Sequence, residues 1–423
     1  MNRQELANQY TTVRQQTEEI CRPLETEDYV IQSIEDVSPP KWHLGHTTWF
    51  FEQVILEQLQ KAYQRYHPEY YFVFNSYYES FGNRVQRDHR GTLSRPLVSQ
   101  VYAYRREIDR RMLELIRSID ENGIAELEKL TVLGTHHEQQ HQELLVSDIK
   151  HIFAGNPLRP IYSQNGSAPA ERPAPELKYV SFEGGLHEFG ADSPPFAYDN
   201  EFPRHRAYVG DFKLADRLVT CGEYLEFMKD GGYENPLLWL SDGWDTIRTR
   251  GWKAPLYWEQ IDGTWSVATL SGFRPVRSDE PVCHVSFYEA AAYARWASKR
   301  LPTEFEWELA ARSHKPDIRH GNFLESGRFH TVPLDRRQVG NGGLKQMFGD
   351  VWEWTNSAYL PYPGYLREQG ALGEYNGKFM SNQMVLRGGS CATPQSHIRD
   401  TYRNFFQCDK RWQFTGFRMA EDA

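Results

Sequence analysis

The stretch His136-His137-Glu138-Gln139-Gln140-His141-Gln142-Glu143 places two histidines, His137 and His141, four residues apart. On an α-helix, residues i and i+4 lie one above the other on the same face. Two imidazoles held in this way can bind one metal ion. Leucines recur at helical spacing around the pair, so we expect it to face the interior of a helical domain. A third imidazole would complete the site, and the best candidate lies far upstream, His46 in Trp42-His43-Leu44-Gly45-His46.

Four helical patterns divide the first part of the chain: residues 4–20, a segment opened by Pro39-Pro40, a segment opened by Pro96, and residues 124–153. Four helices of this length are typical of an up-and-down bundle, whose core commonly holds metals on side chains from facing helices. One histidine on the second helix and a pair on the fourth fit that arrangement. We therefore predict a helical domain over residues 1–156.

The residue pattern of the sequence changes after a proline-rich segment. Residues 157–177 combine prolines with Ser, Gly and Ala, which predicts a linker. Residues 178–423 are predicted to form an irregular α+β domain of short aromatic strands and Gly-rich turns. We expect strands at 179–182, 206–209 and 384–387, and two helices, one after Thr220 and one over 287–298.

Composition limits the function classes. The chain has 423 residues, 25% of them charged, with a formal net charge of −9. Without a dense Lys/Arg run, such a chain is a poor nucleic-acid binder, because neutralising phosphates supplies most of that affinity. No apolar run reaches the length of a membrane span, and Met1-Asn2-Arg3-Gln4-Glu5 starts no apolar signal segment. We therefore expect a cytoplasmic protein without membrane or nucleic-acid partners. An oligomer is compatible with the sequence.

The five cysteines are scattered and form no Cys-x-x-Cys pair, so neither a disulfide framework nor a zinc–thiolate site is expected.

The motif His-Glu-x-x-His is also the signature of zinc metalloproteases, in which the glutamate is the general base. That alternative predicts a third ligand downstream, and no His-x-x-Gly-x-x-His extension follows His141. Glu138 is instead expected to face solvent or another helix. Three imidazoles without a carboxylate suit zinc and iron alike, so these residues do not determine which metal binds.

Several longer motifs resemble one known family. The first half contributes Ser38-Pro39-Pro40-Lys41-Trp42-His43-Leu44-Gly45-His46 and the His137-to-His141 run with its continuation to Lys150. The second half contributes Pro281-Val282-Cys283-His284-Val285-Ser286, Arg300-Leu301-Pro302-Thr303-Glu304-Phe305-Glu306-Trp307-Glu308, Gly349-Asp350-Val351-Trp352-Glu353-Trp354 and Arg387-Gly388-Gly389-Ser390. With these motifs the chain resembles the non-haem iron(II) sulfoxide synthases of ergothioneine biosynthesis. Its second half resembles the formylglycine-generating enzymes.

The resemblance implies an α+β multidomain protein, with an N-terminal DinB-like four-helix bundle followed by a C-type-lectin-like domain that completes the active site. It implies that His46, His137 and His141 bind Fe(2+). It also implies a reaction in which O₂ joins a cysteine-type thiol to the imidazole C2 of hercynine (Nα-trimethylhistidine), leaving a sulfoxide.

The resemblance also implies a proton donor near the metal. The run Asn75-Ser76-Tyr77-Tyr78-Glu79 is similar to a tyrosine pair in one branch of the family. Tyr78 is then the expected acid, with Tyr77 lining the pocket. The alternative is two aromatic residues packed between helices.

Substrate-binding residues follow from the same resemblance. Arg87 and Arg90 resemble the spaced arginines that hold the thiol substrate's carboxylates, a task that suits a fork-shaped guanidinium. A solvated surface role is the alternative for either. The remaining candidates would surround hercynine, as polar contacts or as an aromatic wall for its quaternary ammonium: Gln140, Asn404, Phe405, Phe406 and Trp412.

At one position the chain departs from the family pattern, and this leaves the identity of the thiol substrate open. Where the better-known branch has Trp-Asp, this chain has Phe405-Phe406. Without that carboxylate, the thiol could be γ-glutamylcysteine, free cysteine or a selenium analogue.

Three other functions compete with the sulfoxide-synthase interpretation. A formylglycine-generating oxidase needs two cysteines shortly after Arg-Gly-Gly-Ser, but Cys391 comes directly after Ser390 and Cys408 comes too late. A selenoneine- or ovothiol-type synthase could use the same scaffold, although ovothiol synthases usually carry an extra methyltransferase domain, for which no room is expected after Ala423. A metal-binding lectin-like module without catalysis is the third.

Overall fold

The computed structural model describes residues 1–163, 171–192, 196–334, 343–367 and 371–423. They form two compact units. Unit 1 comprises Met1–Tyr162 and Gln369–Tyr375, and unit 2 comprises Ser163–Glu368 and Asn376–Ala423. The division at 162/163 falls inside the predicted linker 157–177, of which residues 164–170 lie outside the described residues. The short segment ending at Tyr375 was predicted to belong to the second domain, and it groups with the first.

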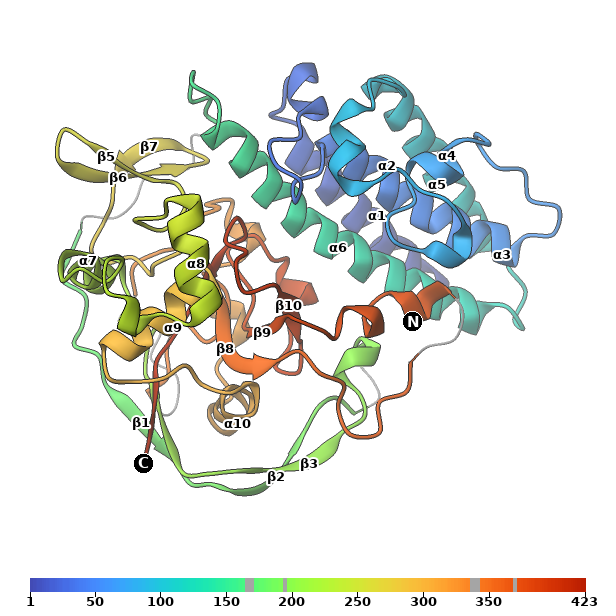
Figure 1. The fold of residues 1–423 in the computed structure, drawn as a ribbon. Helices are drawn as coiled ribbons and strands as arrows, with labels where there is room; N and C mark the ends of the chain where they lie inside the picture. The colour runs from blue at the N-terminus through green and yellow to red at the C-terminus, as the bar shows by residue number, and fades with distance from the viewer. Residues whose placement is uncertain (164–170, 193–195, 335–342, 368–370) are drawn as a thin grey trace. The chain divides into compact units, whose positions relative to one another are not determined.

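Unit 1 is built on four long helices (Figure 1): α1 Arg3–Cys21, α2 Pro40–Phe50, α5 Val98–Ser118 and α6 Ile124–Ala154. Their starts follow local sequence rules. Asn2 accepts a hydrogen bond from the backbone N–H of Glu5, whose side chain accepts from the N–H of Asn2, a capping box. Pro40 occupies the first turn of α2, where its missing N–H costs nothing. The four helices confirm the helical bundle expected from the sequence.

Helix α2 continues beyond Phe50 as a π-helical stretch, Phe51–Leu56, and a short turn α3, Glu57–Leu59. A further short helix, α4 (Tyr70–Val73), ends beside α2. The close approach depends on Gly45, because a Cβ at that position would lie 2.1 Å from the Phe74 ring. Gly45 therefore lets the chain after α4 run against the helix that carries His46.

The described residues of unit 2 form four small sheets of short strands. A three-stranded sheet has the order β1 (Tyr179–Phe182), β4 (Phe212–Ala215), β12 (Ala420–Asp422), and a four-stranded sheet has the order β10 (Asn404–Phe406), β9 (Met384–Arg387), β8 (Trp352–Ala358), β11 (Thr415–Gly416). A ribbon pairs β2 (Gly185–Phe189) with β3 (His205–Val209), and β5 (Trp258–Ile261), β6 (Thr264–Thr269) and β7 (Gly272–Pro275) form a meander. All pairs except β8–β11 are antiparallel.

Four α-helices accompany these sheets in the described part of unit 2: α7 Cys221–Lys229, α8 Ser241–Arg250, α9 Phe287–Trp296 and α10 Glu304–His314. Only α7 and α9 were predicted from the sequence, so the prediction of two helices was wrong. Helix α10 begins with a capping box between Thr303 and Glu306, a signal present in the sequence. Helix α8 contains Gly243 in its first turn, where a Cβ would lie 2.9 Å from the Tyr288 ring, so packing rather than propensity favours it.

A buried ion network joins α10 to the four-stranded sheet. Arg387 on β9 is fully buried and donates to Glu304 (3.1 Å) and Glu308 (2.8 Å). Arg403 donates to both oxygens of Glu304, at 2.8 and 3.0 Å. Paired carboxylates make the burial of these guanidiniums tolerable. The Arg-Gly-Gly-Ser motif thus has a structural role here, holding helix to sheet.

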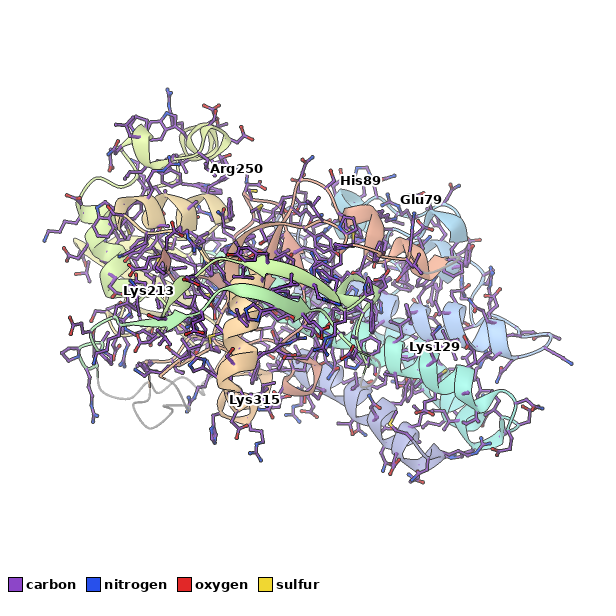
Figure 2. All side chains as sticks on the ribbon, turned by 90° about the horizontal axis from the view of Figure 1, so that it is seen from below. Glu79, His89, Lys129, Lys213, Arg250 and Lys315 are labelled. Carbon is purple, nitrogen blue, oxygen red and sulfur yellow. The ribbon has the colours of Figure 1, made fainter. Side chains whose placement is uncertain are left out.

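Figure 2 labels Glu79, His89 and Lys129 on unit 1, and Lys213, Arg250 and Lys315 on unit 2. Within the described ranges, no helix combines the length and apolar character needed to cross a bilayer.

Candidate metal centre

Three histidines converge inside unit 1. His46 comes from α2, and His137 and His141 come from adjacent turns of α6. One ring nitrogen from each lies within 4.8 Å of the other two. Among the described residues, this is the one group of three or more His, Cys, Asp or Glu side chains with such spacing. The structure thus brings together the trio named from sequence.

The ring nitrogens of the trio are oriented for a ligand. His46 Nδ1 lies 2.7 Å from the carbonyl oxygen of Phe74, so Nδ1 carries the proton and donates it, and Nε2 keeps its lone pair. The Nε2 of His46 and both ring nitrogens of His137 are buried and make no hydrogen bond to any described residue. Buried polar atoms normally have a partner, so this arrangement fits a metal ion bound by imidazole nitrogens.

Electrostatics keep the three rings neutral. Burial lowers the pKa of His137 to about 3. Burial, followed by the proximity of His137, holds the pKa values of His46 and His141 well below the ordinary value. Metal ions bind the neutral imidazole, so at neutral pH none of the three has to lose a proton first.

Aromatic rings fix the orientation of two of the imidazoles. His46 lies between Trp42, stacked at 4.7 Å with an interplanar angle of 10°, and Trp49, stacked at 5.5 Å and 17°. Phe50 stacks on His137 at 4.4 Å. These walls limit rotation of the rings and reduce access of water from those sides.

Glu138 faces away from the trio. It is fully buried, and it accepts hydrogen bonds from Arg14 (2.8 Å) and Thr17 (2.6 Å) on α1 and from Arg105 (2.6 Å) on α5. A carboxylate engaged by two guanidiniums is not available as the general base of a metalloprotease. The geometry supports the expectation that Glu138 faces other helices, and it removes the basis for the protease alternative.

The tyrosine pair lies beside the trio rather than on it. Tyr78 is fully buried, and its ring lies 4.7 Å from Tyr77 and 5.6 Å from Trp49, which itself stacks on His46. Burial raises the pKa of the Tyr78 hydroxyl, so it remains protonated at neutral pH.

A third tyrosine, Tyr375, lies directly against His137 of the trio. It was not among the residues predicted from the sequence. Its ring is 5.7 Å from His137, edge to face, and 6.2 Å from Tyr77. Beside it, the Glu374 carboxylate accepts the backbone N–H of Glu79 at 3.0 Å. Tyr375 lies more than two hundred positions after His137 in a stretch without a metal or catalytic motif. No pattern in the sequence could have indicated its position.

The two arginines have different environments. Arg90 is 5% exposed, and its guanidinium lies 3.4 Å from the centroid of Trp42, on which it stacks. It donates to the hydroxyls of Ser38 (2.9 Å) and Ser76 (3.0 Å). Arg87 is exposed and donates to the carbonyl oxygen of Asp36.

The other predicted substrate residues are divided between the units. Gln140 is half-buried on α6 in unit 1. Asn404, Phe405 and Phe406 form strand β10 of unit 2. Phe405 stacks on Tyr359 at 4.0 Å, and Phe406 lies 5.6 Å from the buried Trp412.

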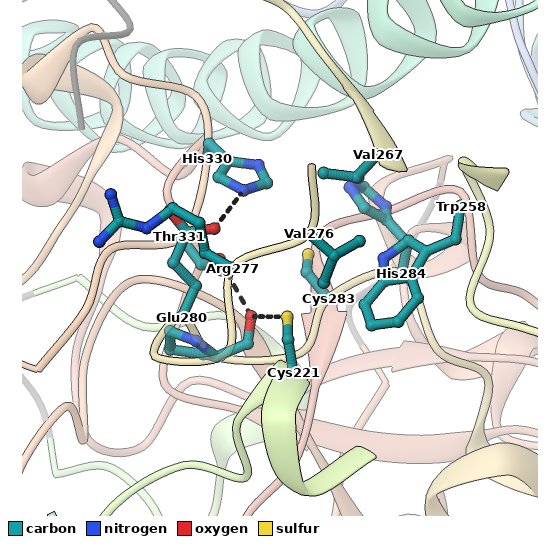
Figure 3. A pocket seen from close by; sticks show the side chains of 11 residues that line it. Cys221, Trp258, Val267, Val276, Arg277, Glu280, Cys283, His284, His330 and Thr331 are labelled. Atoms are coloured by element: carbon teal, nitrogen blue, oxygen red, sulfur yellow. Dashed lines mark hydrogen bonds and ion pairs between the residues drawn. The ribbon is translucent and has the colours of Figure 1, made fainter. Parts of the chain in front are cut away.

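Unit 2 also contains a small cavity near α7 (Figure 3), lined among others by Cys221, Cys283 and Trp258. On its polar side Glu280 contacts His330 at 3.1 Å, and the Cys221 thiol points to the carbonyl oxygen of Pro281. The cavity has about 10 Å³ of free volume, roughly enough for one water molecule. It is too small for an amino-acid substrate.

Comparisons with known proteins agree with this architecture. Residues 9–145 match the DinB superfamily model, and residues 164–423 match the sulfatase-modifying factor enzyme 1-like domain. The hercynine oxygenase of Mycolicibacterium smegmatis is 34% identical over 68% of this chain and 70% of its own length. That of Mycobacterium tuberculosis is 32% identical over 77% and 79%. The formylglycine-generating enzyme of Bos taurus is 28% identical over 63% and 84%.

A DinB-type helical unit with three converging histidines, followed by a sulfatase-modifying-factor-like domain, defines the class as a two-domain enzyme with a candidate metal centre. The chain belongs to the hercynine oxygenase family, and it is an oxygenase.

Proposed function

We propose that this protein is an iron(II)- and O₂-dependent sulfoxide synthase that joins a cysteine-type thiol to the imidazole C2 of hercynine. The observation that carries the proposal is the convergence of three imidazoles, two of which have buried nitrogens without a hydrogen-bond partner among the described residues, in a chain of the hercynine oxygenase family. His46, His137 and His141 would hold the metal, which when bound supplies the redox chemistry between O₂ and the two organic substrates.

The overall reaction balances. One thiol, one hercynine and one O₂ give the sulfoxide and one water. Forming the C–S bond releases two electrons together with the thiol and C2 hydrogens, and oxidising the sulfur to the sulfoxide releases two more. O₂ accepts all four, and one of its oxygen atoms remains on sulfur. No external reductant is needed.

Arg90 is suited to hold the thiol substrate by a carboxylate. No described carboxylate lies within ion-pair distance of its guanidinium, and its two side-chain acceptors are neutral hydroxyls. Burial, followed by the charges of Arg87 and Arg84, lowers the pKa of Arg90. A buried cation in this situation gains from an anionic ligand, and a carboxylate satisfies a guanidinium fork bidentately. The exposed Arg87 would make a secondary contact.

Proton supply would come from the tyrosines. A buried phenol with a raised pKa keeps its proton until an oxygen atom in the site becomes more basic. Tyr78 would serve as this acid, with Tyr77 stacked on it and Tyr375 in turn against Tyr77. Gln140, with Asn404 and the aromatic residues Phe405, Phe406 and Trp412, would bind hercynine.

The test is anaerobic loading with iron(II), followed by O₂, hercynine and each candidate thiol separately, with mass analysis of the products. We expect a hercynine–thiol sulfoxide and O₂ uptake that needs both substrates. Product from a selenium donor alone would make the chain a selenoneine-type synthase, and product from histidine would make it ovothiol-type. Stoichiometric metal without any turnover would leave a binding module and contradict the proposal.

The His137→Ala variant is the control for the metal. It should load no iron and form no product. The His151→Asn variant, altered on the same helix where the ring contacts Ser33 instead of the trio, should load iron like the unaltered chain.

A further inference from the structure

A chain of polar contacts leads from His141 to a carboxylate on the same helix. The Nδ1 atoms of His141 and His43 lie 2.9 Å apart. On the other side of the His43 ring, Nε2 lies 3.0 Å from the Oδ2 of Asp148. His43 and Asp148 are 1% and 2% exposed. His141 and Asp148 are seven residues apart, two turns of α6, so both face α2, which supplies His43.

With Asp148 ionised and the His43 ring neutral, the contacts determine which nitrogen of each ring carries a proton. An ionised carboxylate only accepts hydrogen bonds, so the Nε2 of His43 must be the donor to Asp148. In a neutral ring Nδ1 of His43 is then an acceptor, and it accepts the Nδ1–H of His141. His141 therefore holds its proton on Nδ1 and has its lone pair on Nε2. The opposite tautomer of His43 would place two lone pairs against Asp148 and two protons between the histidines.

Asp148 also ties the relay to the start of α2. Its Oδ2 accepts the backbone N–H of Ser38 at 2.8 Å, just before the proline pair that opens the helix. One carboxylate on α6 thus fixes both the His43 ring and the beginning of the helix that carries His46. Outer hydrogen bonds of this kind commonly orient metal-bound imidazoles and increase their basicity.

We infer that His43 and Asp148 are positioning residues, which hold His141 in the tautomer and orientation that present Nε2 to the metal. The inference rests on the metal site proposed above. His43 is not itself a ligand, because its Nδ1 accepts from His141 and its Nε2 donates to Asp148. The relay parallels the contact of His46 with the Phe74 carbonyl, so two of the three imidazoles have Nδ1 engaged and Nε2 available.

The test measures binding of Co(II), a spectroscopic substitute for iron(II), by absorption titration of the full chain. Losing an outer hydrogen-bond partner typically weakens metal affinity about 10- to 100-fold, and we expect this loss for His43→Leu and Asp148→Ala. His43→Asn should stay within about threefold of the unaltered chain, because the amide oxygen can accept the His141 Nδ1–H. The Glu126→Gln variant is the control, an exposed change on the same helix outside the relay.

The tautomer is read independently of folding yield and activity. In metal-free protein labelled with ¹⁵N-histidine, His141 should show a protonated Nδ1 and an unprotonated Nε2. The His43→Leu variant should show a mixture of both tautomers, and His43→Asn should restore the first. A protonated Nε2 on His141 in the unaltered chain would overturn the inference.

The outcomes separate the relay from the site it serves. If His43→Leu and Asp148→Ala bind Co(II) as tightly as the unaltered chain while His137→Ala does not, the relay is refuted and the metal site stands. If the unaltered chain fails to bind Co(II), the proposed metal site fails and the inference fails with it.

Discussion

At the scale of single residues, the candidate centre is defined by buried polar atoms without a hydrogen-bond partner among the described residues. The Nε2 of His46 and the two nitrogens of His137 are such atoms, and Arg90 is a buried cation that, in the described part of the chain, contacts hydroxyls and an indole. Leaving groups like these unsatisfied costs free energy, which a bound metal and a bound carboxylate would recover. The same cost makes these residues the most informative ones to change.

Replacing Arg90 should weaken binding of the thiol substrate. Hydrogen bonds to charged groups contribute about 1.5–3 kcal/mol, so Arg90→Leu should raise the KM for the thiol about 10- to 100-fold. Steady-state kinetics with each substrate varied in turn would measure this, and the KM for hercynine should change less. Arg87→Ala, which removes an exposed guanidinium, should have the smaller effect. A larger effect from Arg87→Ala would reverse the two roles.

Replacing Tyr78 by Phe removes the expected acid while keeping the aromatic packing. Metal loading should be unchanged, because the ring contacts with Tyr77 and Trp49 are retained. Sulfoxide formation should fall about 100-fold, the typical contribution of one general acid, with oxidation of the thiol alone as the competing outcome. Product analysis would show it. Tyr375→Phe is the comparison, and loss of sulfoxide only in that variant would assign the acid to Tyr375.

At the scale of elements, the bundle depends on the ion network around Glu138. Arg14 on α1 and Arg105 on α5 both donate to this carboxylate on α6, one residue after His137. Burial would raise the pKa of Glu138, but the guanidiniums of Arg105 and Arg14 outweigh it and lower the pKa to about 2. The network therefore fixes the rotation of the helix that carries two of the three imidazoles.

Glu138→Gln should destabilise the protein by about 3 kcal/mol, since two buried guanidiniums lose the carboxylate they share and each keeps one other, Asp109 for Arg14 and Glu18 for Arg105. The depressed pKa adds a pH signature. Stabilisation by Glu138 is complete above its unfolded value near 4.5 and is lost as the pH falls toward 2. Urea unfolding between pH 7 and 3 should show the difference between the two proteins narrowing below pH 4.5. Glu126→Gln, an exposed change on α6, should cost little. Equal costs at both positions would contradict this role.

The helices also show which of them could be predicted from local sequence signals. Proline at the start of α2 and the apolar period of α6 predicted both helices that carry the trio. Helix α10 was missed although Thr303 and Glu306 form a capping box, and α8 was missed because Gly243 weakens its pattern. Local propensity thus predicted the helices of the first unit better than those of the second. In the second unit, short elements depend on packing between segments far apart in sequence.

At the scale of the whole molecule, metal removal should lower the unfolding temperature of unit 1. A ligand at a free concentration of about 100 times its Kd stabilises the folded state by about 2.7 kcal/mol, which corresponds to about 5–10 °C for a unit of this size. Calorimetry of the chain with and without Co(II) would measure the shift. The fluorescence of Trp42 and Trp49, which flank His46, would report binding. His137→Ala should show no shift, and an equal shift in that variant would place the metal elsewhere.

The candidate site could be predicted from sequence only where its members share a helix or a motif. His137 and His141 followed from helical spacing, and His46 was the best remaining imidazole. Tyr375 could not be predicted, because its place beside His137 depends on the chain returning to unit 1 from a distant segment. The relay through His43 and Asp148 was missed for another reason, since a lone histidine is more often a satisfied core residue than part of a site.

That return of the chain has a consequence for any attempt to dissect the protein. A fragment ending at Tyr162 would contain every imidazole of the trio yet lack Glu374 and Tyr375, and a fragment starting at Ser163 would carry them without the helices they pack on. Each unit is therefore built from two separate stretches of the chain. No single cut yields a complete half, so either fragment expressed alone would lack part of the contacts around the trio.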